Sequence, residues 1–327
     1  MVRLMHENQA ETHEPSGLLI IDKPRGPTSH DVVAKIRRTL RTRSVGHAGT
    51  LAPMATGVLV VMVGQCTKLS RFLTLEDKVY RTTVLLGQGT DTLDAEGVAT
   101  DSAPVPTSLI EVLARIELGH IDVPADSVLA DALGVERART SQVPPMHSAI
   151  KQDGVVSYVR ARRGEQVELP TRDVRVLRLD VVGASVDPPT LQLELHVTKG
   201  YYVRSLARDL GEALGLPAHL VALRRIRSGS FGLEGAVALG ADAATMQHAM
   251  LSVEQAAREC LASATLTSPG VLRAIRGQTL GEEDFDQAPG EAVSGWFAPG
   301  GRLVAVGDRS KGRPTVLRAF LHVDEMC

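Results

Sequence analysis

The stretch Gly46–Val63, GHAGTLAPMATGVLVVMV, joins a glycine-rich loop to a run of apolar residues. Residues Gly57–Val63 are apolar without interruption over the length of a strand, which is typical of a strand buried on both faces of a sheet. The preceding loop is not a P-loop, because no Gly-Lys-Ser or Gly-Lys-Thr follows its glycines. From the residues alone, the stretch predicts a tight connection at the end of a buried sheet strand.

The neighbouring segments mix strands and helices without regular alternation. Gly17–Asp22 and Val79–Leu86 predict two more strands, each an apolar run bounded by polar or turn residues. Apolar residues recur at helical spacing between residues 32 and 40, and they alternate with polar residues between 191 and 197. This mixture predicts an α+β fold with a central mixed sheet, because a doubly wound parallel sheet would need strands and helices in strict alternation.

The C-terminal third of the chain has a different pattern. Glu234–Thr267 is rich in alanine and predicts helices. Four short segments then predict strands separated by Gly, Pro and Asp, namely Leu272–Leu280, Gly295–Phe297, Leu303–Val306 and Thr315–Val323. We therefore expect a flexible tail at residues 1–16, a large domain at 17–250 and a small β domain at 265–327.

The composition indicates a cytoplasmic protein with reduced thiols. In the 327 residues, no apolar run approaches the roughly 18 to 20 residues of a membrane span. Residues 1–17 are polar and do not resemble a signal peptide. Cys66, Cys260 and Cys327 are far apart and lack CxxC spacing, which argues against a disulfide framework and against a structural zinc site.

The charge is unevenly distributed along the chain. A net charge of −2 argues by itself against a nucleic-acid partner. However, seven basic residues and one acid lie between Lys23 and Arg43, and six basic residues and two acids lie between Lys199 and Arg227. These stretches could meet on one face and bind RNA, while solvated helix faces are the alternative that the charge leaves open.

Three further segments combine cations with rings or prolines. Lys78-Val79-Tyr80-Arg81 opens a strand and places a ring beside two cations. Such a ring can stack on an unpaired base, although packing is the commoner role of a lone tyrosine. Gln142–Lys151 is an extended connection with two prolines, and Lys199–Arg204 ends a strand before a helix.

Taken in order, these segments resemble the blocks of the bacterial TruB family. The blocks are Gly17–Ser29, Gly46–Leu59, Lys78–Gly97, Gln142–Lys151 and Lys199–Arg225. The family converts the T-loop uridine of tRNA, at tRNA position 55, to pseudouridine. The resemblance implies a pseudouridine synthase core around a mixed, mostly antiparallel sheet. Residues 273–278 and 303–307 are similar to the PUA-like RNA-binding domain that follows this core in the family.

The resemblance also implies the reaction and the partners. Enzymes of this family break the N-glycosidic bond, turn the uracil and rejoin it through carbon, without a metal or cofactor. The implied partner is the T arm of tRNA. No membrane and no obligatory protein partner is expected, and a monomer is the default.

Roles for individual residues follow from the same resemblance. The family motif Gly-His-x-Gly-x-Leu-Asp-Pro has its nucleophilic aspartate at position 52, where this chain has Ala52. Arg204 matches the arginine that holds that carboxylate, and Tyr80 matches the ring that stacks on the flipped uracil. The implied substrate-binding residues are His47, which props the T loop, and Lys23, Pro24, Lys199, Tyr202 and Leu220.

Ala52 is the main departure from the family pattern. A methyl group cannot attack, accept a proton or pair with Arg204, so negligible turnover is predicted. Asp91 and Asp94 are the nearest acids in the family order, but they lack the ligand set of a calcium loop and predict a turn held by Asx hydrogen bonds. No neighbour is expected to replace the carboxylate, and Arg204 is expected to turn to solvent or to an RNA phosphate.

Two origins of Ala52 fit the sequence equally. It could be an engineered substitution that inactivates the enzyme, or the chain could be a natural non-catalytic protein that binds or folds tRNA. Under either origin, the surrounding residues His47, Tyr80 and Arg204 are intact.

A second departure is an insertion at about residues 120–141. Some twenty residues, Asp122–Ser141, stand where the family has a short connection, and Ala130–Arg139 within them predicts a short helix. Loops of this length are uncommon unless they are functional or disordered. A tolerated surface insertion is expected, with contact to RNA or to a partner as the alternative.

Overall fold

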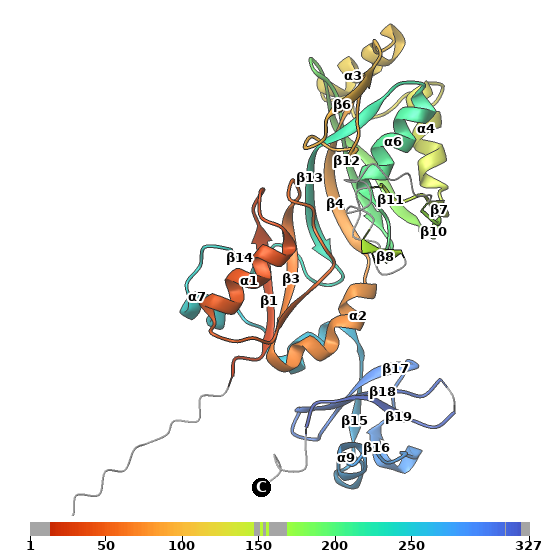
Figure 1. Ribbon diagram of the computed structural model, residues 1–327. Coiled ribbons are helices and arrows are strands. Elements are labelled where there is room, and N and C mark those ends of the chain that lie inside the picture. The colour runs from red at the N-terminus through yellow and green to blue at the C-terminus, as the bar shows by residue number, and fades with distance from the viewer. Residues whose placement is uncertain (1–13, 147–150, 153–154, 157–168, 311, 322–327) are drawn as a thin grey trace, which may run out of the picture.

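The computed structural model describes residues 14–146, 151–152, 155–156, 169–310 and 312–321, and Figure 1 shows their arrangement. Three predicted features extend beyond these residues. They are most of the tail at 1–16, residues 147–150 of the fourth family block, and the end of the last predicted strand.

An eight-stranded sheet forms the larger part of the molecule. Its order is β11 (Val176–Val186), β12 (Pro189–Val197), β4 (Lys78–Leu86), β13 (Ala218–Ser228), β3 (Thr56–Val63), β1 (Gly17–Lys23) and β14 (Val237–Ala238), with β2 (Val45–Ala48) also paired to β3. The pairs β3–β13 and β1–β14 are parallel, and the other five are antiparallel. The predicted α+β fold with a mixed, mostly antiparallel sheet is confirmed.

The remaining elements of this part are short. The helices are α1 (Ser29–Thr39), η1 (Gly64–Leu69), α2 (Ser70–Leu75), α3 (Thr107–Glu117), α4 (Val128–Arg137), α6 (Val203–Leu214), α7 (Ala243–His248) and α8 (Val253–Cys260). The short strands are β5 (Gln88–Thr90), β6 (Ala99–Ser102), β7 (Ser141–Gln142), β8 (Lys151–Gln152), β9 (Val155–Val156) and β10 (Arg172–Asp173). None of the described helices is both long and apolar enough to cross a membrane.

Strands β1 and β3 are buried on both faces, which explains their continuous apolar sequences. Leu19 and Leu59 belong to the main core, which α1, α3, α4 and α6 cover. Leu18 and Val58, one residue away on the same strands, belong to a second core on the opposite face. The fully buried strand predicted at Gly57–Val63 is therefore confirmed.

The C-terminal domain packs against this second core. Its five-stranded sheet has the order β16 (Phe285–Gln287), β15 (Ala262–Leu266), β17 (Val293–Phe297), β18 (Leu303–Asp308) and β19 (Thr315–Ala319), with helices α9 (Ser268–Ile275) and η2 (Glu282–Asp284). Phe297 and Phe320 join the second core together with residues of β1 and β3. Lys68 of η1 donates a hydrogen bond to the carbonyl of Ala319 at 2.9 Å.

One predicted element in this region is wrong, and another is right only in part. Leu272–Leu280 was expected as a strand, but α9 ends at Ile275 and begins after Thr267, whose hydroxyl accepts from the Gly270 N–H at 3.1 Å. Thr267 is therefore a helix N-cap, a signal that the strand prediction overlooked. The helical prediction for Glu234–Thr267 is confirmed for α7 and α8, but the segment ends in β15, which pairs in parallel with the distant β17.

The inserted segment is part of the main core. The predicted helix is confirmed as α4, but the interpretation as a tolerated surface insertion is wrong. Leu129 and Leu133 are 0% and 1% exposed and pack in the main core, where α4 lies against α6 and β11. A helix with an apolar stripe at this spacing buries that face on its neighbours.

Gly57 has a backbone conformation that favours glycine, and the sheet leaves no room for a side chain at this position. Its φ is +96°, and a Cβ atom would overlap the carbonyl oxygen of Arg225 on the paired strand. Gly119, after α3, has a nearly equal φ of +93° but open space around it. Both glycines thus have a positive φ, but only Gly57 lacks room for a side chain.

We expect Gly57→Ala to lower the free energy of unfolding much more than Gly119→Ala does. The left-handed conformation should cost about 1 kcal/mol at either position, and the overlap should add roughly 1–3 kcal/mol at Gly57 alone. Urea denaturation of both variants measures the difference. Equal destabilisation would contradict the close approach of β3 and β13.

Candidate functional site

Five strands place one row of residues across the middle of the sheet. The register pairs Leu195 with Tyr80, Tyr80 with Arg225, Arg225 with Gly57, and Gly57 with Lys23. Directly paired residues have their side chains on the same face of a sheet. The structure therefore brings the predicted residues Tyr80 and Lys23 to one face and places Arg225 between them.

Arg225 fixes the start of the glycine-rich loop. It is 1% exposed, its Nε donates to the Val58 carbonyl at 2.7 Å, and its Nη2 donates to the Gly49 carbonyl at 3.0 Å. A buried guanidinium is stable only when its donors are satisfied. Arg225 belongs to the basic run between Lys199 and Arg227, but its role was not predicted, because its two hydrogen bonds join positions 167 and 176 residues apart.

Lys23 fixes the end of the same loop. Its side chain is fully buried, and its Nζ donates to the carbonyls of Ala55 at 2.7 Å, Pro24 at 3.0 Å and Pro53 at 3.3 Å. Pro24 itself is exposed and enters the site through its carbonyl. Lys23 and Pro24 thus hold the loop from the strand-turn in which the sequence predicted them.

Ser29 fixes the middle of the loop. This buried serine at the start of α1 accepts from the Leu51 N–H at 2.9 Å and donates to the Leu51 carbonyl at 3.2 Å. Because Thr28 caps the helix with Asp31, the hydroxyl of Ser29 is available for the loop. The backbone on both sides of residue 52 is therefore held by side chains from β1, β13 and α1.

Ala52 lies in this fixed loop as a partly buried methyl group against the main core. Its carbonyl accepts from the Ala55 N–H at 3.0 Å, which closes a turn. Within the part of the chain that the structure describes, neither Lys23 nor Arg225 has a carboxylate at salt-bridge distance. The loop thus has a defined conformation and cationic surroundings, but no acidic group at residue 52.

A third buried cation, Lys78, lies near the same loop. It is 7% exposed and donates to the Thr74 carbonyl at 3.0 Å and to the Glu76 carbonyl. Burial lowers the pKa of Lys78 to about 8, and Arg225 contributes in the same direction. Burial also lowers the pKa of Lys23 to about 8, with Glu96 opposing the shift and Arg225 adding to it.

Arg204 has a counter-ion. Its Nη1 lies 3.2 Å from Asp94 Oδ2 and donates to the Thr92 carbonyl at 3.2 Å, and the two charged side chains are 14% and 4% exposed. The expectation that Arg204 turns to solvent or to a phosphate is therefore wrong. The error arose because Asp94 is 110 residues away in sequence and was judged only by its own turn.

Asp94 is held rigidly in that turn. Its Oδ1 accepts from the Thr92 hydroxyl at 2.7 Å and from the Glu96 N–H at 3.1 Å. The predicted Asx hydrogen bond is confirmed at Asp94, whereas Asp91 Oδ1 accepts from the more distant Val98 N–H at 2.8 Å. Between them, Leu93 has a φ of +62°, a conformation that is unusual for leucine and is found at functional sites.

His47 of β2 is neutral and carries a free acceptor or donor. Burial lowers its pKa to about 4, and His30 adds to this shift. The two rings meet edge to face with centroids 5.5 Å apart. The buried Nδ1 of His47 has no hydrogen-bond partner among the described residues. A buried nitrogen in this state is costly, so it is a candidate to bind a ligand.

Tyr202 and Lys199 flank the N-terminus of α6. The backbone N–H of Tyr202 donates to Gln142 Oε1 at 2.8 Å, and its carbonyl accepts from Gln142 Nε2 at 3.2 Å. This double contact fixes the backbone two residues before Arg204. Lys199 is exposed at the preceding turn, close enough to Lys78 to help lower its pKa.

Leu220 and Tyr80, which were predicted to contact the flipped base, expose little of their side chains. Leu220 is fully buried and donates its N–H to the Leu93 carbonyl at 3.1 Å, so it packs in the core behind Asp94. Tyr80 is 8% exposed in the main core. Leu223, two residues before Arg225, lies on the same face and is partly exposed. The strand alternation of β13 could have identified it.

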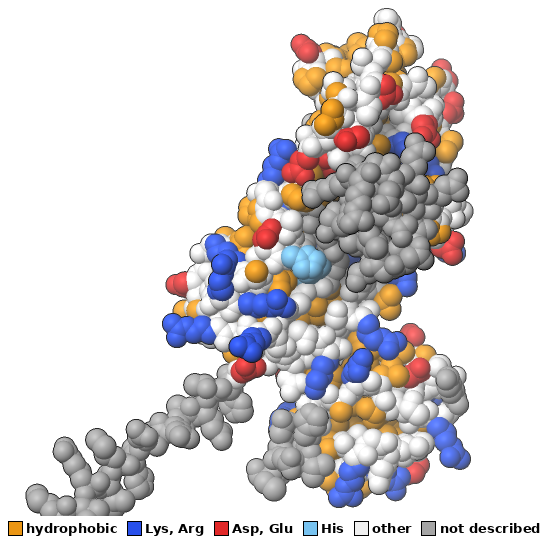
Figure 2. All heavy atoms as spheres, in the orientation of Figure 1, with side chains coloured by type: hydrophobic (Ala, Val, Ile, Leu, Met, Phe, Trp, Pro, Cys, Tyr) orange, Lys and Arg blue, Asp and Glu red, His pale blue; other side chains and the backbone are white. Residues whose placement is uncertain are grey.

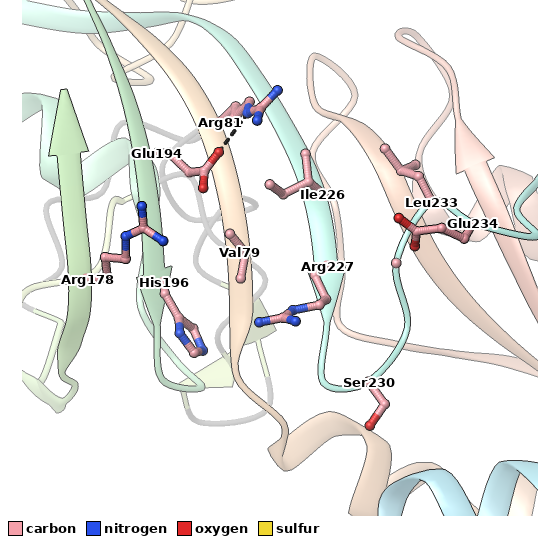
Figure 3. Close-up of a pocket in the computed structure, with 11 residues that line it drawn as sticks. Val79, Arg81, Arg178, Glu194, His196, Ile226, Arg227, Ser230, Leu233 and Glu234 are labelled. Carbon is pink, nitrogen blue, oxygen red and sulfur yellow. Dashed lines mark hydrogen bonds and ion pairs between the residues drawn. The ribbon is translucent and has the colours of Figure 1, made fainter. Parts of the chain in front are cut away.

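The opposite face of the sheet has a separate pocket of about 570 Å³, shown in Figure 3. Val79, Arg81 and Arg227 point into it, and Arg81 pairs with Glu194 at 2.7 Å. Because Arg81 alternates with Tyr80 along β4, this pocket and the row of Lys23, Arg225 and Tyr80 lie on different faces. The pocket is therefore not the site of the predicted chemistry.

Exposed cations gather on two parts of the surface. Figure 2 shows Lys and Arg side chains gathered beside α1 and near the small C-terminal domain. Arg37, Arg38, Arg41 and Arg43 are exposed at the end of α1 and in the turn that follows it. Such a distribution provides a positive surface despite the net charge of −2.

Comparison with known proteins connects this site to one family. A model of the TruB family pseudouridylate synthase N-terminal domain matches residues 37–203, and a model of the tRNA pseudouridylate synthase B C-terminal domain matches 204–264. The chain is 41% identical to tRNA pseudouridine synthase B of Thermobifida fusca, over 93% of this chain and 98% of that protein. With the Streptomyces coelicolor protein of the same name it shares 41% identity, over 94% and 97%.

A solved structure has the same fold. A chain from the crystal structure of a Cbf5-Nop10-Gar1 complex matches with a TM-score of 0.69 and 24% identity, covering 96% of this chain and 88% of that one. At this identity the likeness concerns the fold.

The buried Lys23 should make stability depend on pH in a defined window. Its folded pKa of about 8 lies below its ordinary value of 10.5, so the unfolded chain binds more protons between these two values. The contribution of Lys23 to the free energy of unfolding should therefore rise as the pH increases from about 8 to 10.5. Urea denaturation of the protein and of Lys23→Met across this range measures it. A pH-independent difference between the two would contradict the assignment.

Proposed function

The chain belongs to the TruB family of pseudouridylate synthases, and on this premise we propose that it binds the T arm of tRNA and flips the T-loop uridine towards the Gly49–Ala55 loop. The observation that carries the proposal is the loop itself. Side chains from three elements fix its backbone on both sides of residue 52, beside two buried cations. Only a carboxylate at position 52 is missing from the arrangement that the reaction requires.

The proposed reaction explains why that carboxylate matters. Breaking the bond between uracil and C1′ of ribose leaves an electron-poor sugar centre, which a carboxylate can attack or stabilise. After the uracil turns and C5 bonds to C1′, the proton on C5 must leave to a base. The methyl group of Ala52 can perform neither step. We therefore infer that the chain as written binds tRNA but forms negligible pseudouridine.

Asp94 is a poor substitute for the missing group. It is 3% exposed, one oxygen accepts two hydrogen bonds, and the other pairs with Arg204. To attack the sugar it would have to leave this pairing and expose a buried Arg204 without a counter-charge, which costs several kcal/mol. Its contacts favour a role in holding Arg204.

The other residues have roles that their geometry permits. We propose that the unpaired Nδ1 of His47 meets the T loop, that Lys199 contacts phosphate, and that Tyr80 and Tyr202 provide rings near the flipped base. The partly exposed Leu223 is better placed than Leu220 to form the apolar wall beside the base. The small C-terminal domain is proposed as the PUA-like RNA-binding module.

A second function is favoured by Ala52 itself. The chain could bind and remodel tRNA without changing its bases, since the binding surface does not need the carboxylate. Both functions predict tRNA binding that weakens steeply with salt. If Ala52→Asp forms pseudouridine, the assignment of residue 52 to the active site is supported. That result does not show whether Ala52 is engineered or natural.

The decisive comparison is between the chain as written and Ala52→Asp, with an unmodified tRNA transcript as substrate. Both should bind the transcript with similar affinity, and only Ala52→Asp should form pseudouridine. The difference in rate should be on the order of a million-fold, as for the loss of other catalytic nucleophiles. Mass spectrometry of T-loop fragments measures the product, and filter binding measures the affinity.

Two matched variants make the comparison specific. Ala52→Asn has the size of aspartate without its charge or nucleophilicity, so it should stay inactive. Asp94→Asn tests the remaining carboxylate in the chain as written. Normal turnover by that chain, lost in Asp94→Asn, would show that Asp94 is the nucleophile and that our assignment of position 52 is wrong.

A further inference from the structure

The inserted helix α4 brings a buried acid into the main core. Its inward face consists of Leu129, Ala132, Leu133 and Glu136, at the spacing of one helical stripe, and all four are at most 3% exposed. An apolar residue at position 136 would continue this stripe without desolvating a charge. A carboxylate there is stable only because its neighbours satisfy it.

Both oxygens of Glu136 have partners. Oε1 accepts from the hydroxyl of Tyr201 at 2.6 Å, and Oε2 accepts from Arg139 Nε at 2.7 Å. Arg139 Nη1 also lies 3.4 Å from Asp209 Oδ2 on α6. Tyr201 is 8% exposed, so its hydroxyl is buried with the carboxylate. Hydrogen bonds to a charged acceptor in such surroundings are stronger than neutral ones.

Tyr201 lies directly before the residues that the proposed function needs. Tyr202 follows it, and Arg204, which pairs with Asp94, is three residues away. The backbone of Tyr202 is itself held by the side chain of Gln142, the residue that follows the inserted segment. The turn from Lys199 to Arg204 is thus fixed at two adjacent residues by one stretch of chain, residues 136–142.

Glu136 contributes little to stability that an apolar side chain could not supply. Replacing buried ionic groups by apolar ones of similar volume is often neutral or stabilising. What an apolar side chain cannot supply is the directional contact with the Tyr201 hydroxyl, which fixes the rotation of this ring and the backbone that carries it.

We propose that Glu136 is a positioning residue. It acts through the hydroxyl of Tyr201 and holds the Tyr202–Arg204 segment in the geometry used on the substrate. The role of Tyr202 and Arg204 towards tRNA is taken from the proposed function, and only this part of the proposal rests on it. The contact itself belongs to the inserted helix and can be tested without any turnover.

Amide hydrogen exchange of the chain as written tests the contact. Glu136→Leu keeps the apolar packing and removes the acceptor, and Tyr201→Phe keeps the ring and removes the donor. Each should speed the exchange of the Tyr202 and Leu206 amides, which donate to Gln142 and to the Tyr202 carbonyl. The expected factor is about tenfold, the equivalent of one buried hydrogen bond. Exchange in β3 should be unchanged.

Three controls make the result specific. Glu136→Gln retains an acceptor for the hydroxyl and should stay near the parent exchange rate. Asp131→Asn removes an exposed acid from the outer face of the same helix and should have no effect. In the double variant Glu136→Leu with Tyr201→Phe, the exchange should be no faster than in Glu136→Leu alone, because that change has already removed the acceptor of the Tyr201 hydroxyl.

A second readout separates positioning from folding. In the Ala52→Asp background, Glu136→Leu should lower the rate of pseudouridine formation at saturating tRNA about tenfold, with the affinity changed less than about twofold. Unchanged exchange at the Tyr202 and Leu206 amides, or equally faster exchange throughout the sheet, would overturn the proposal. If Ala52→Asp forms no product, the proposed function fails, and the exchange result still decides the role of Glu136.

Discussion

The Gly49–Ala55 loop is held by buried cations that donate to its backbone carbonyls. Lys23 reaches it from β1 and Arg225 reaches it from β13, so both strands must flank β3, from which the loop emerges. The parallel pairing of β3 with β13, unusual in a mostly antiparallel sheet, brings Arg225 beside Gly57. A side chain at position 57 would overlap the Arg225 backbone, so the glycine, the strand order and the cation depend on one another.

This arrangement separates the shape of the loop from the chemistry of residue 52. None of the hydrogen bonds that fix the loop uses the side chain at that position, where Ala52 accepts through its backbone carbonyl. The absence of a carboxylate therefore leaves the backbone in place. Arg204 does not depend on residue 52 either, because Asp94 supplies its counter-charge. The conformation of the loop and the pairing of Arg204 therefore do not depend on the side chain at position 52.

The elements of the fold that depend on local sequence patterns were predictable from the sequence. The contacts of the site were predictable only in part. A continuous apolar run identified the two-sided burial of β3, and a short helix was predicted where α4 forms. The contacts of Arg225 and of Arg204 with Asp94 join residues more than a hundred positions apart, so no local pattern could reveal them. The strand β15 was missed because its alanine-rich sequence favours a helix, whereas its pairing with β17 decides its structure. The added helix was judged by its absence from the family, although its buried stripe already indicated a place in the core.

The same buried cations explain how a chain with net charge −2 can suit a polyanion. Lys23, Lys78 and Arg225 donate hydrogen bonds to carbonyl oxygens, which are dipoles and carry no net counter-charge. Burial lowers the pKa values of both lysines, and repulsion from Arg225 adds to the lowering. An anion entering the site would relieve the repulsion, and a carboxylate at position 52 would do so from within the loop. With alanine at position 52, the phosphates of a polyanion can supply negative charge at these cations, so the proposed binding of tRNA does not require a carboxylate at this position.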